Sequence, residues 1–210
     1  MERYRNILRK EIVTAVLLCM AIVFVGCKNE TDTTLTQQQQ SIEKYLTSSH
    51  NPRLIEETEI ANSPQSNPPF YTRWDMDIYR YIATYYDEGR EKLPEITNGS
   101  TFDITYTAYI FNGNAPQTTD MFATNDAAQL EELKAMGLTP TYEWSTEPKR
   151  VTMGKGDLFA SLETALESCR EGDDIEVYLT YPEAYGKNYI GKVPSKSAQM
   201  WKIKIEEVIE

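Results

Sequence analysis

Three segments of this chain alternate between apolar and polar side chains, and one helical stripe of apolar residues lies between the first and the second of them. The alternating segments cover residues 102–111, 175–180 and 201–206. The helical stripe consists of Leu158, Leu162, Ala165, Leu166 and Cys169. A period of two is typical of strands, and a spacing of three to four residues is typical of an amphipathic helix. The pattern predicts an α+β domain in which a twisted antiparallel sheet wraps one amphipathic helix.

Other segments give weaker patterns. Residues 70–86 are rich in aromatic and β-branched side chains, which favours strands, although Trp74, Ile78 and Tyr81 also fit a helical stripe. A helix is expected over residues 125–136, with a cap at its start and Gly137 as its stop. A short helix is expected from Ile42 to near Ser48, because apolar residues recur there at helical spacing.

The composition excludes several classes of function. The chain of 210 residues carries 21 Lys plus Arg against 32 Asp plus Glu, a net charge of −11, which argues against a nucleic-acid partner. One histidine and three cysteines are too few for a multi-His metal site, a Cys-rich zinc site or a disulfide scaffold. No cofactor or metal is therefore expected. The surplus lies in aromatic residues, with 14 Tyr, 6 Phe and 3 Trp.

The N-terminus is typical of an exported protein. A basic segment over residues 1–11 precedes an apolar run over residues 12–26, which is too short to cross a bilayer comfortably and predicts a signal peptide over residues 1–26. The alternative is a buried helix with an incidental cysteine. The run ends in Gly26-Cys27, which resembles a bacterial lipobox. That resemblance implies that Cys27 carries a lipid. Because Lys28 stands where an inner-membrane retention Asp is usual, it also implies the outer membrane, with the domain in the periplasm or at the surface.

The remaining chain divides by composition. Residues 27–40 are predicted to be the lipidated cysteine and a flexible polar tether, and residues 41–97 an N-terminal helix followed by an aromatic extension. The main domain is expected over residues 98–210, with an inserted helical segment at 114–152. Cys169 falls on the apolar helical face, so a buried, unreactive thiol is expected there.

The order of motifs in this main domain resembles the FKBP-type peptidyl-prolyl cis-trans isomerases. The matching motifs are Met153-Gly154, Leu158-Phe159, Gly172, Ala184-Tyr185-Gly186, Val193-Pro194 and Trp201. Residues 99–113 also resemble a strand of that family, which supplies Tyr106. The resemblance covers residues 98–210 and implies an FKBP-like fold. It further implies an activity on X-Pro segments of exported polypeptides that needs no acid or base, only a dry aromatic pocket.

The resemblance also implies roles for single residues. Tyr185 matches the tyrosine whose hydroxyl bonds the substrate, and Tyr106 matches a tyrosine of the pocket wall; these two are the expected catalytic residues. The expected substrate-binding residues are Leu158, Phe159, Leu162, Val193, Trp201 and Phe122. For Tyr106, Phe159 and Trp201, ordinary core packing is the alternative interpretation.

The chain departs from the family pattern at three positions and in one segment. Leu162 stands where the family has the Trp at the pocket floor, Ala123 follows Phe122 where an Asp is expected, and Lys149 lies near the place of a pocket Phe. The insert at 114–152 is expected to be a lid, a surface that binds a partner, or a surface insertion without a role at the site.

Three functions from different classes are therefore considered. The first is a lipid-anchored prolyl isomerase that acts as a folding factor, and the second is an FKBP-fold module that binds a protein without turnover. The third is a surface lipoprotein that stacks glycans on an aromatic platform. That platform would consist of Trp74, Tyr79, Tyr81, Tyr85 and Tyr86.

Overall fold

The computed structural model describes residues 32–65, 67–138 and 144–209. The expected signal peptide and the lipidation site Cys27 lie outside the described residues. Residues 34–210 form one compact unit, so the aromatic extension and the main domain belong to the same folded body. In the part of the chain that is described, no helix is both long enough and apolar enough to cross a membrane.

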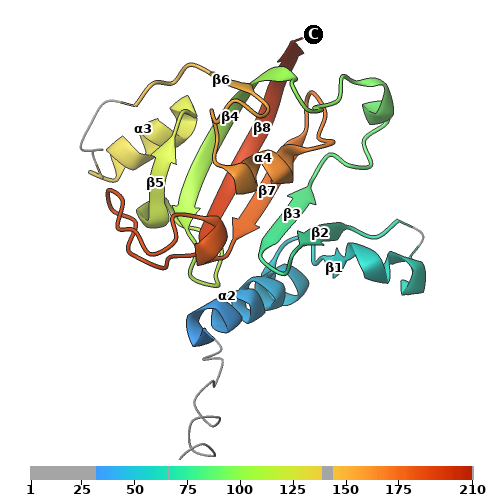
Figure 1. The fold of residues 1–210 in the computed structure, drawn as a ribbon, viewed down its shortest axis with the longest axis horizontal. Coiled ribbons are helices and arrows are strands. Elements are labelled where there is room, and N and C mark those ends of the chain that lie inside the picture. The colour runs from blue at the N-terminus through green and yellow to red at the C-terminus, as the bar shows by residue number, and fades with distance from the viewer. Residues whose placement is uncertain (1–31, 66, 139–143, 210) are drawn as a thin grey trace, which may run out of the picture. The chain divides into compact units, whose positions relative to one another are not determined.

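The core of the fold is an eight-stranded sheet (Figure 1). Its strands are β1 (Ile55–Glu56), β2 (Phe70–Trp74), β3 (Ile78–Ile82), β4 (Thr101–Ile110), β5 (Met121–Thr124), β6 (Lys149–Thr152), β7 (Asp174–Leu179) and β8 (Gln199–Ile209). The strand order is β1-β2-β3-β7-β8-β4-β5, and β6 also pairs with β4. All pairs are antiparallel except β1 with β2. The long strands β4 and β8 pair along their length at the centre.

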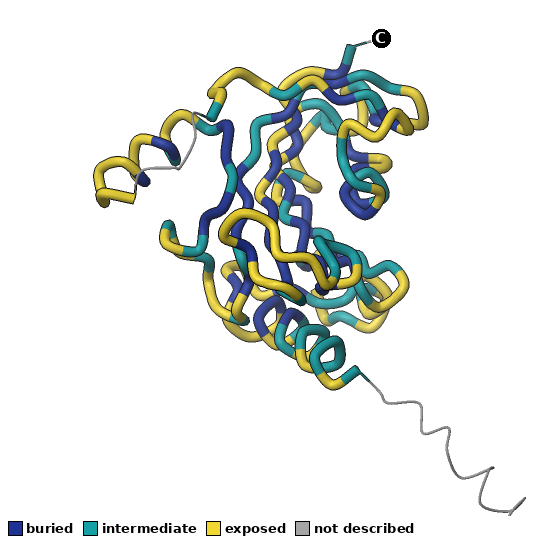
Figure 2. The backbone as a smooth tube through the Cα atoms, turned by 60° about the vertical axis from the view of Figure 1, so that its left-hand side comes forward, coloured by how far each residue is buried: buried dark blue, intermediate teal, exposed yellow. Residues whose placement is uncertain are grey.

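The strands confirm the main sequence predictions. The alternating segments form β4, β7 and β8, and the ambiguous aromatic segment forms the antiparallel hairpin β2–β3 rather than a helix. The α+β class and the antiparallel sheet are therefore confirmed. The insert contributes more than its helix, because β5 and β6 both add to the sheet through β4. Figure 2 shows the buried residues mainly along the extended central segments of the backbone and the exposed residues mainly in the outer loops.

The expected central helix is α4 (Ala160–Leu166), which packs on one face of the sheet. It is shorter than the predicted stripe, since Phe159 is its N-cap and Leu158 precedes it. Cys169 follows the helix and is still fully buried. Burial raises the pKa of this thiol to about 11, so it stays protonated and unreactive at neutral pH.

Helix α3 (Ala127–Ala135) confirms the helix predicted within the insert. Asp126 caps it by accepting hydrogen bonds from the backbone nitrogens of Ala128 and Gln129. Leu130 and Leu133 are the two residues of the helix that are buried.

The prediction of a flexible tether up to residue 40 is wrong for the part that the structure describes. Helix α2 (Thr33–Lys44) begins well before the predicted short helix and continues into a π-helical turn, Tyr45–Ser49. Gln38 explains the helical order of this polar stretch. Its Nε2 donates to the Lys196 carbonyl and its Oε1 accepts from the Tyr181 nitrogen, both at 2.8 Å. Glutamine is a good helix former, and these tertiary bonds hold a helix that has little apolar surface of its own.

Helix α2 helps to build a second apolar cluster. The cluster includes Ile42, Tyr45, Leu46, Tyr79, Tyr109, Phe111, Tyr178 and Met200. Neighbouring strand residues point to opposite faces of a sheet, so this cluster lies on the face opposite α4. The sheet is thus covered by α4 on one face and partly by α2 on the other.

Candidate functional site

Five aromatic side chains meet on the α4 side of the sheet, around the indole of Trp201. The ring centroids of Tyr106, Phe122 and Phe159 lie 5.5, 5.7 and 5.7 Å from that of Trp201. The ring of Tyr185 lies 5.9 Å from Phe122 and 6.1 Å from Phe159. Most of these pairs are edge-to-face, an arrangement that aromatic rings prefer.

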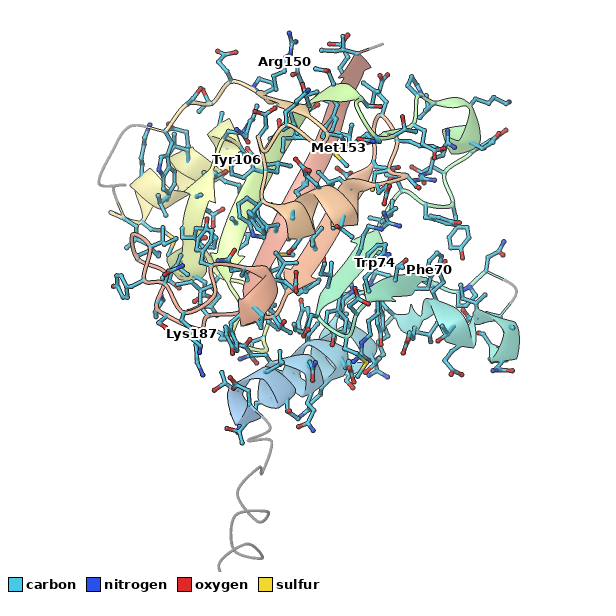
Figure 3. The ribbon with its side chains drawn as sticks, viewed as in Figure 1. Phe70, Trp74, Tyr106, Arg150, Met153 and Lys187 are labelled. Atoms are coloured by element: carbon cyan, nitrogen blue, oxygen red, sulfur yellow. The ribbon has the colours of Figure 1, made fainter. Side chains whose placement is uncertain are left out.

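Each ring comes from a different element. Tyr106 lies on β4 and Trp201 on the neighbouring strand β8, so their side chains share one face of the sheet. Phe122 lies on β5, Phe159 caps the start of α4, and Tyr185 follows the short turn Tyr181–Glu183. The cluster therefore exists only when the sheet, the helix and the loop after β7 are all in place. Figure 3 labels Tyr106 on its strand, beside α4 and the insert.

The cluster has a buried floor and an open rim. Trp201 is only 7% exposed and Phe122 is equally buried, whereas Tyr106, Phe159, Tyr185 and Leu158 are half-buried and pack against the core. The half-buried rings of Tyr106, Phe159 and Tyr185 over the buried rings of Trp201 and Phe122 form the surface that we call the aromatic cleft. Such a surface presents aromatic rings to a ligand, and its buried centre is kept from water. Two predicted binding residues, Leu162 and Val193, are instead inside the core. They support the cleft by packing, because a fully buried side chain touches a ligand only after its neighbours move.

Trp201 of β8 lies at the centre of the five rings. It contacts three of the others, whereas Leu162, at the position where a Trp was expected, is fully buried. An aromatic residue in an alternating strand carries no sequence signal that distinguishes a cleft floor from ordinary core. Only the pairing of β8 with β4 and the position of α4 show it.

Gln199 is a site residue that the sequence did not reveal. The Trp201 Nε1–H donates to Gln199 Oε1 at 3.0 Å, and Gln199 is 0% exposed. Its Nε2 makes no hydrogen bond with any residue that the structure describes. The indole can only donate, so this bond sets the orientation of both side chains.

The turn before Tyr185 is tied to α4. Ser161 at the start of the helix donates a 2.5 Å hydrogen bond to the Glu183 carboxylate. Ser161 is buried, and the bond joins the two elements that carry Phe159 and Tyr185. It therefore helps to keep these two rings at their distance.

A groove of about 410 Å³ adjoins the cleft at Tyr106. Its lining consists of Tyr106, Ala123, Thr124, Asn125, Trp144, Ser145, Glu147, Pro148 and Lys149. Asn125 links its two sides, because its Nδ2 donates to the carbonyls of Ile104 and Glu147. The described part of the insert thus borders the cleft and adds a polar wall to it, with Ala123 and Lys149 in the positions where an Asp and a Phe were expected.

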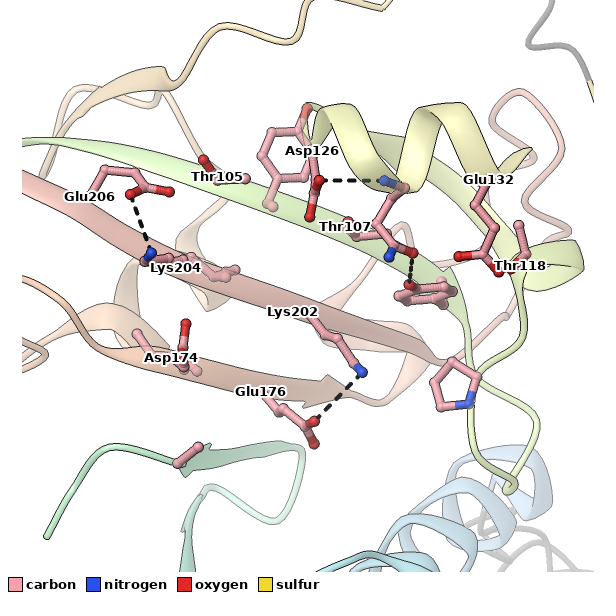
Figure 4. Close-up of a pocket in the computed structure, with 17 residues that line it drawn as sticks. Thr105, Thr107, Thr118, Asp126, Glu132, Asp174, Glu176, Lys202, Lys204 and Glu206 are labelled. Atoms are coloured by element: carbon pink, nitrogen blue, oxygen red, sulfur yellow. Dashed lines mark hydrogen bonds and ion pairs between the residues drawn. The ribbon is translucent and has the colours of Figure 1, made fainter. Parts of the chain in front are cut away.

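A larger groove of about 660 Å³ lies on the other face of the sheet (Figure 4). Charged residues dominate it and pair with one another, as Lys202 does with Glu176 and Lys204 with Glu206. It lacks the four rings of Phe122, Phe159, Tyr185 and Trp201. Its lining holds five acidic residues and two basic ones, so its surface is that of a solvated, acidic sheet face.

The proposed glycan platform is not formed. Tyr79 and Tyr81 are buried, and the Arg80 guanidinium covers the Trp74 ring at 4.6 Å. Tyr85 and Tyr86 are exposed but pack edge-to-face on each other. A sugar ring needs an open, flat aromatic face, and these residues do not present a shared one.

The comparisons with known proteins identify the main domain. The family model described as "FKBP-type peptidyl-prolyl cis-trans isomerase" matches residues 94–206. No curated protein matches the chain. Among the solved structures that are similar is the N-terminal domain of FKBP42 from Arabidopsis thaliana, with 16% sequence identity and a TM-score of 0.47. The match covers 70% of this chain and 98% of that chain.

Proposed function

Because the chain belongs to the family of FKBP-type peptidyl-prolyl cis-trans isomerases, we propose that it is a lipid-anchored prolyl isomerase that assists the folding of exported polypeptides. The observation that carries the proposal is the aromatic cleft, in which Tyr106, Phe159 and Tyr185 line an open rim over the floor of Trp201.

The cleft suits this reaction because prolyl isomerisation breaks no covalent bond. The barrier is the resonance of the amide, about 18–20 kcal/mol, and a catalyst lowers it by binding the twisted imide better than either planar form. A dry aromatic floor favours the twisted form, whose carbonyl has lost its resonance and needs less solvation. In this proposal the pyrrolidine ring packs over Trp201, and the Tyr185 hydroxyl donates to a peptide carbonyl of the substrate.

The test is the exchange rate between the cis and trans forms of an X-Pro peptide, measured by NMR with the full chain. Acceleration is expected, and Tyr185→Phe should lower kcat/KM by about three- to tenfold, the effect of one hydrogen bond. Tyr86→Phe is the matched control, because this exposed tyrosine bonds Pro68 far from the cleft.

Two results would each contradict one part of this proposal, the first the isomerase activity and the second the role of Tyr185. If the cis–trans exchange of the peptide is equally slow with and without the protein, the isomerase is contradicted. If the peptide nevertheless binds, the protein is a peptide-binding module without turnover. This second function is favoured by Ala123 and Lys149, which remove two side chains that the family uses in its pocket. Equal activity of wild type and Tyr185→Phe would remove Tyr185 from the mechanism.

The anchor is proposed at Cys27, from the basic segment, the apolar run and the Gly26-Cys27 junction that precede the folded unit. Two or more acyl chains hold a protein stably at a membrane, whereas one chain does so only marginally. Mass spectrometry of the N-terminus should show a diacylated Cys27 in wild type. A wild-type chain that keeps residues 1–26, or that carries no lipid, would refute the anchor.

A further inference from the structure

A basic loop stands out on this acidic protein. The loop, residues 186–196, follows Tyr185 and precedes β8, and it contains Lys187, Lys192 and Lys196 but no Asp or Glu. The chain as a whole has a net charge of −11. The basic loop therefore has the opposite sign to the rest of the molecule.

The tip of the basic loop is apolar and exposed. Tyr189 is 70% exposed and Ile190 is 46% exposed. This exposure comes from a well-defined loop. Ile190 and Val193 exchange two backbone hydrogen bonds of 3.1 and 2.9 Å, and Lys196 N donates to the Gly186 carbonyl at 2.9 Å. Val193 is buried and holds the loop to the core.

The three lysines of the basic loop differ in their surroundings. Lys192 Nζ donates to the Thr119 carbonyl at 2.9 Å, and Lys196 Nζ lies 5.2 Å from the centre of the Tyr181 ring. Glu183, just before the loop, is engaged by Ser161. Lys187 is exposed at the edge of the loop, so it contributes its full charge to that surface.

The basic loop also lies beside the start of the folded chain. Gln38 in the second turn of α2 donates to the Lys196 carbonyl, and Figure 3 labels Lys187 close to the N-terminal end of α2. Only residues 28–32 separate Cys27 from the first residue of α2. Fully extended, such a segment reaches about 17 Å. A lipid on Cys27 would therefore hold this edge of the domain close to the bilayer.

We propose that the basic loop docks on an anionic phospholipid surface, an inference that rests on the proposed lipid anchor. Lys187, at the exposed edge of the loop, contacts a headgroup phosphate, and Tyr189 and Ile190 enter the interfacial layer, where a tyrosine ring is well accommodated. Tyr185 directly precedes the loop, so docking places the aromatic cleft next to the membrane. The substrates it meets first are then X-Pro segments that emerge at the membrane surface.

The test is hydrogen exchange of residues 186–196 in the full chain, reconstituted in vesicles. Vesicles containing phosphatidylglycerol should slow the exchange of the basic loop, and pure phosphatidylcholine vesicles should slow it much less. Lys187→Glu should reduce the protection at least about fivefold, the usual effect of one basic residue near an anionic surface. Tyr189→Ser should reduce it as well. Lys92→Glu is the matched control, since Lys92 is 81% exposed and lies outside this loop.

The outcomes separate the loop from the anchor. Protein that stays on the vesicles while the basic loop exchanges equally fast in both lipids overturns the docking and leaves the anchor intact. Wild-type protein that washes off the vesicles refutes the anchor instead. If, in addition, anionic vesicles do not slow hydrogen exchange of the basic loop before the wash, docking by the loop is overturned as well. Protection that appears only when an X-Pro peptide is added also overturns the proposal, because the loop would then belong to the peptide site.

Discussion

The replacement of Trp201 by Phe tests whether this indole is the floor of the cleft. The indole contacts three rings at centroid distances of 5.5–5.7 Å and donates its N–H to the fully buried Gln199. A phenyl ring keeps the aromatic character but is smaller and has no donor. The substitution therefore removes both the hydrogen bond and part of the ring packing.

The expected loss of stability follows from these two contacts. A buried amide oxygen left without a donor costs about 1–3 kcal/mol. The reduced packing against the three neighbouring rings costs about 1–2 kcal/mol more. Trp201→Phe should thus lower the free energy of unfolding by about 2–5 kcal/mol. It should also lower kcat/KM of the isomerase about tenfold, which corresponds to about 1.4 kcal/mol of lost transition-state stabilisation.

A double-mutant cycle with Gln199→Leu, read by urea denaturation, separates the two effects. In the wild-type background, Gln199→Leu leaves the indole N–H of Trp201 without its acceptor. In the Trp201→Phe background, the same substitution removes an amide that no longer has a donor. The double variant should therefore be more stable than the sum of the single losses by at least about 1 kcal/mol. Additive losses within about 0.5 kcal/mol would show that the bond between Gln199 and Trp201 does not matter and would refute the reasoning.

Three further predictions concern the contacts that hold the fold together. His50 Nε2 lies 2.8 Å from Glu176; burial of His50 opposes its charge, but hydrogen bonds to Glu176 and to a backbone carbonyl raise its pKa overall. The charged His50 stabilises the fold fully below about pH 6.5, the pKa of an unfolded His, and this stabilisation is lost as the pH rises through the raised pKa. In urea denaturation, the free energies of unfolding of wild type and His50→Gln should therefore converge at high pH. Burial likewise opposes the charge of Glu176, but hydrogen bonding lowers its pKa, so its contribution is present above about pH 4.3 and fades as pH falls through the lowered value. Gln38→Ala removes two hydrogen bonds between α2 and the loops beside it, and should speed hydrogen exchange in α2 while the central strands keep their protection. Arg90→Ala removes two 2.6 Å hydrogen bonds from the Asp173 carboxylate, which stays buried. The free energy of unfolding, measured by urea denaturation, should fall by about 3–5 kcal/mol. A fall below about 1 kcal/mol would show that the pair is not effectively buried.

Much of the fold could be predicted because its signals are local. Strands β4, β7 and β8 alternate in sequence, and the helix in the insert has a cap at Asp126 and a stop at Gly137. The polar start of α2 had no such signal. Its order depends on partners far away in the chain, such as the Lys196 carbonyl that Gln38 reaches.

The candidate site was predicted only in part. Tyr106, Phe122, Phe159, Tyr185 and Trp201 were expected at the site from the family pattern, and the structure brings them together. The pattern did not show which ring forms the floor. It also did not show that Leu162 and Val193 are core residues, because the spacing of motifs gives a residue's position along the chain but not its depth below the surface.

The sequence by itself determined the α+β class and the order of the motifs. These properties depend on periodicity and composition, which are local features of the sequence. Only the tertiary structure decided that an indole from β8 lies at the centre of the cleft, that α2 is bound to the domain and that the basic loop lies beside the start of α2. These properties depend on contacts between residues distant in sequence, and the pairing of strands and the packing of helices on the sheet create them.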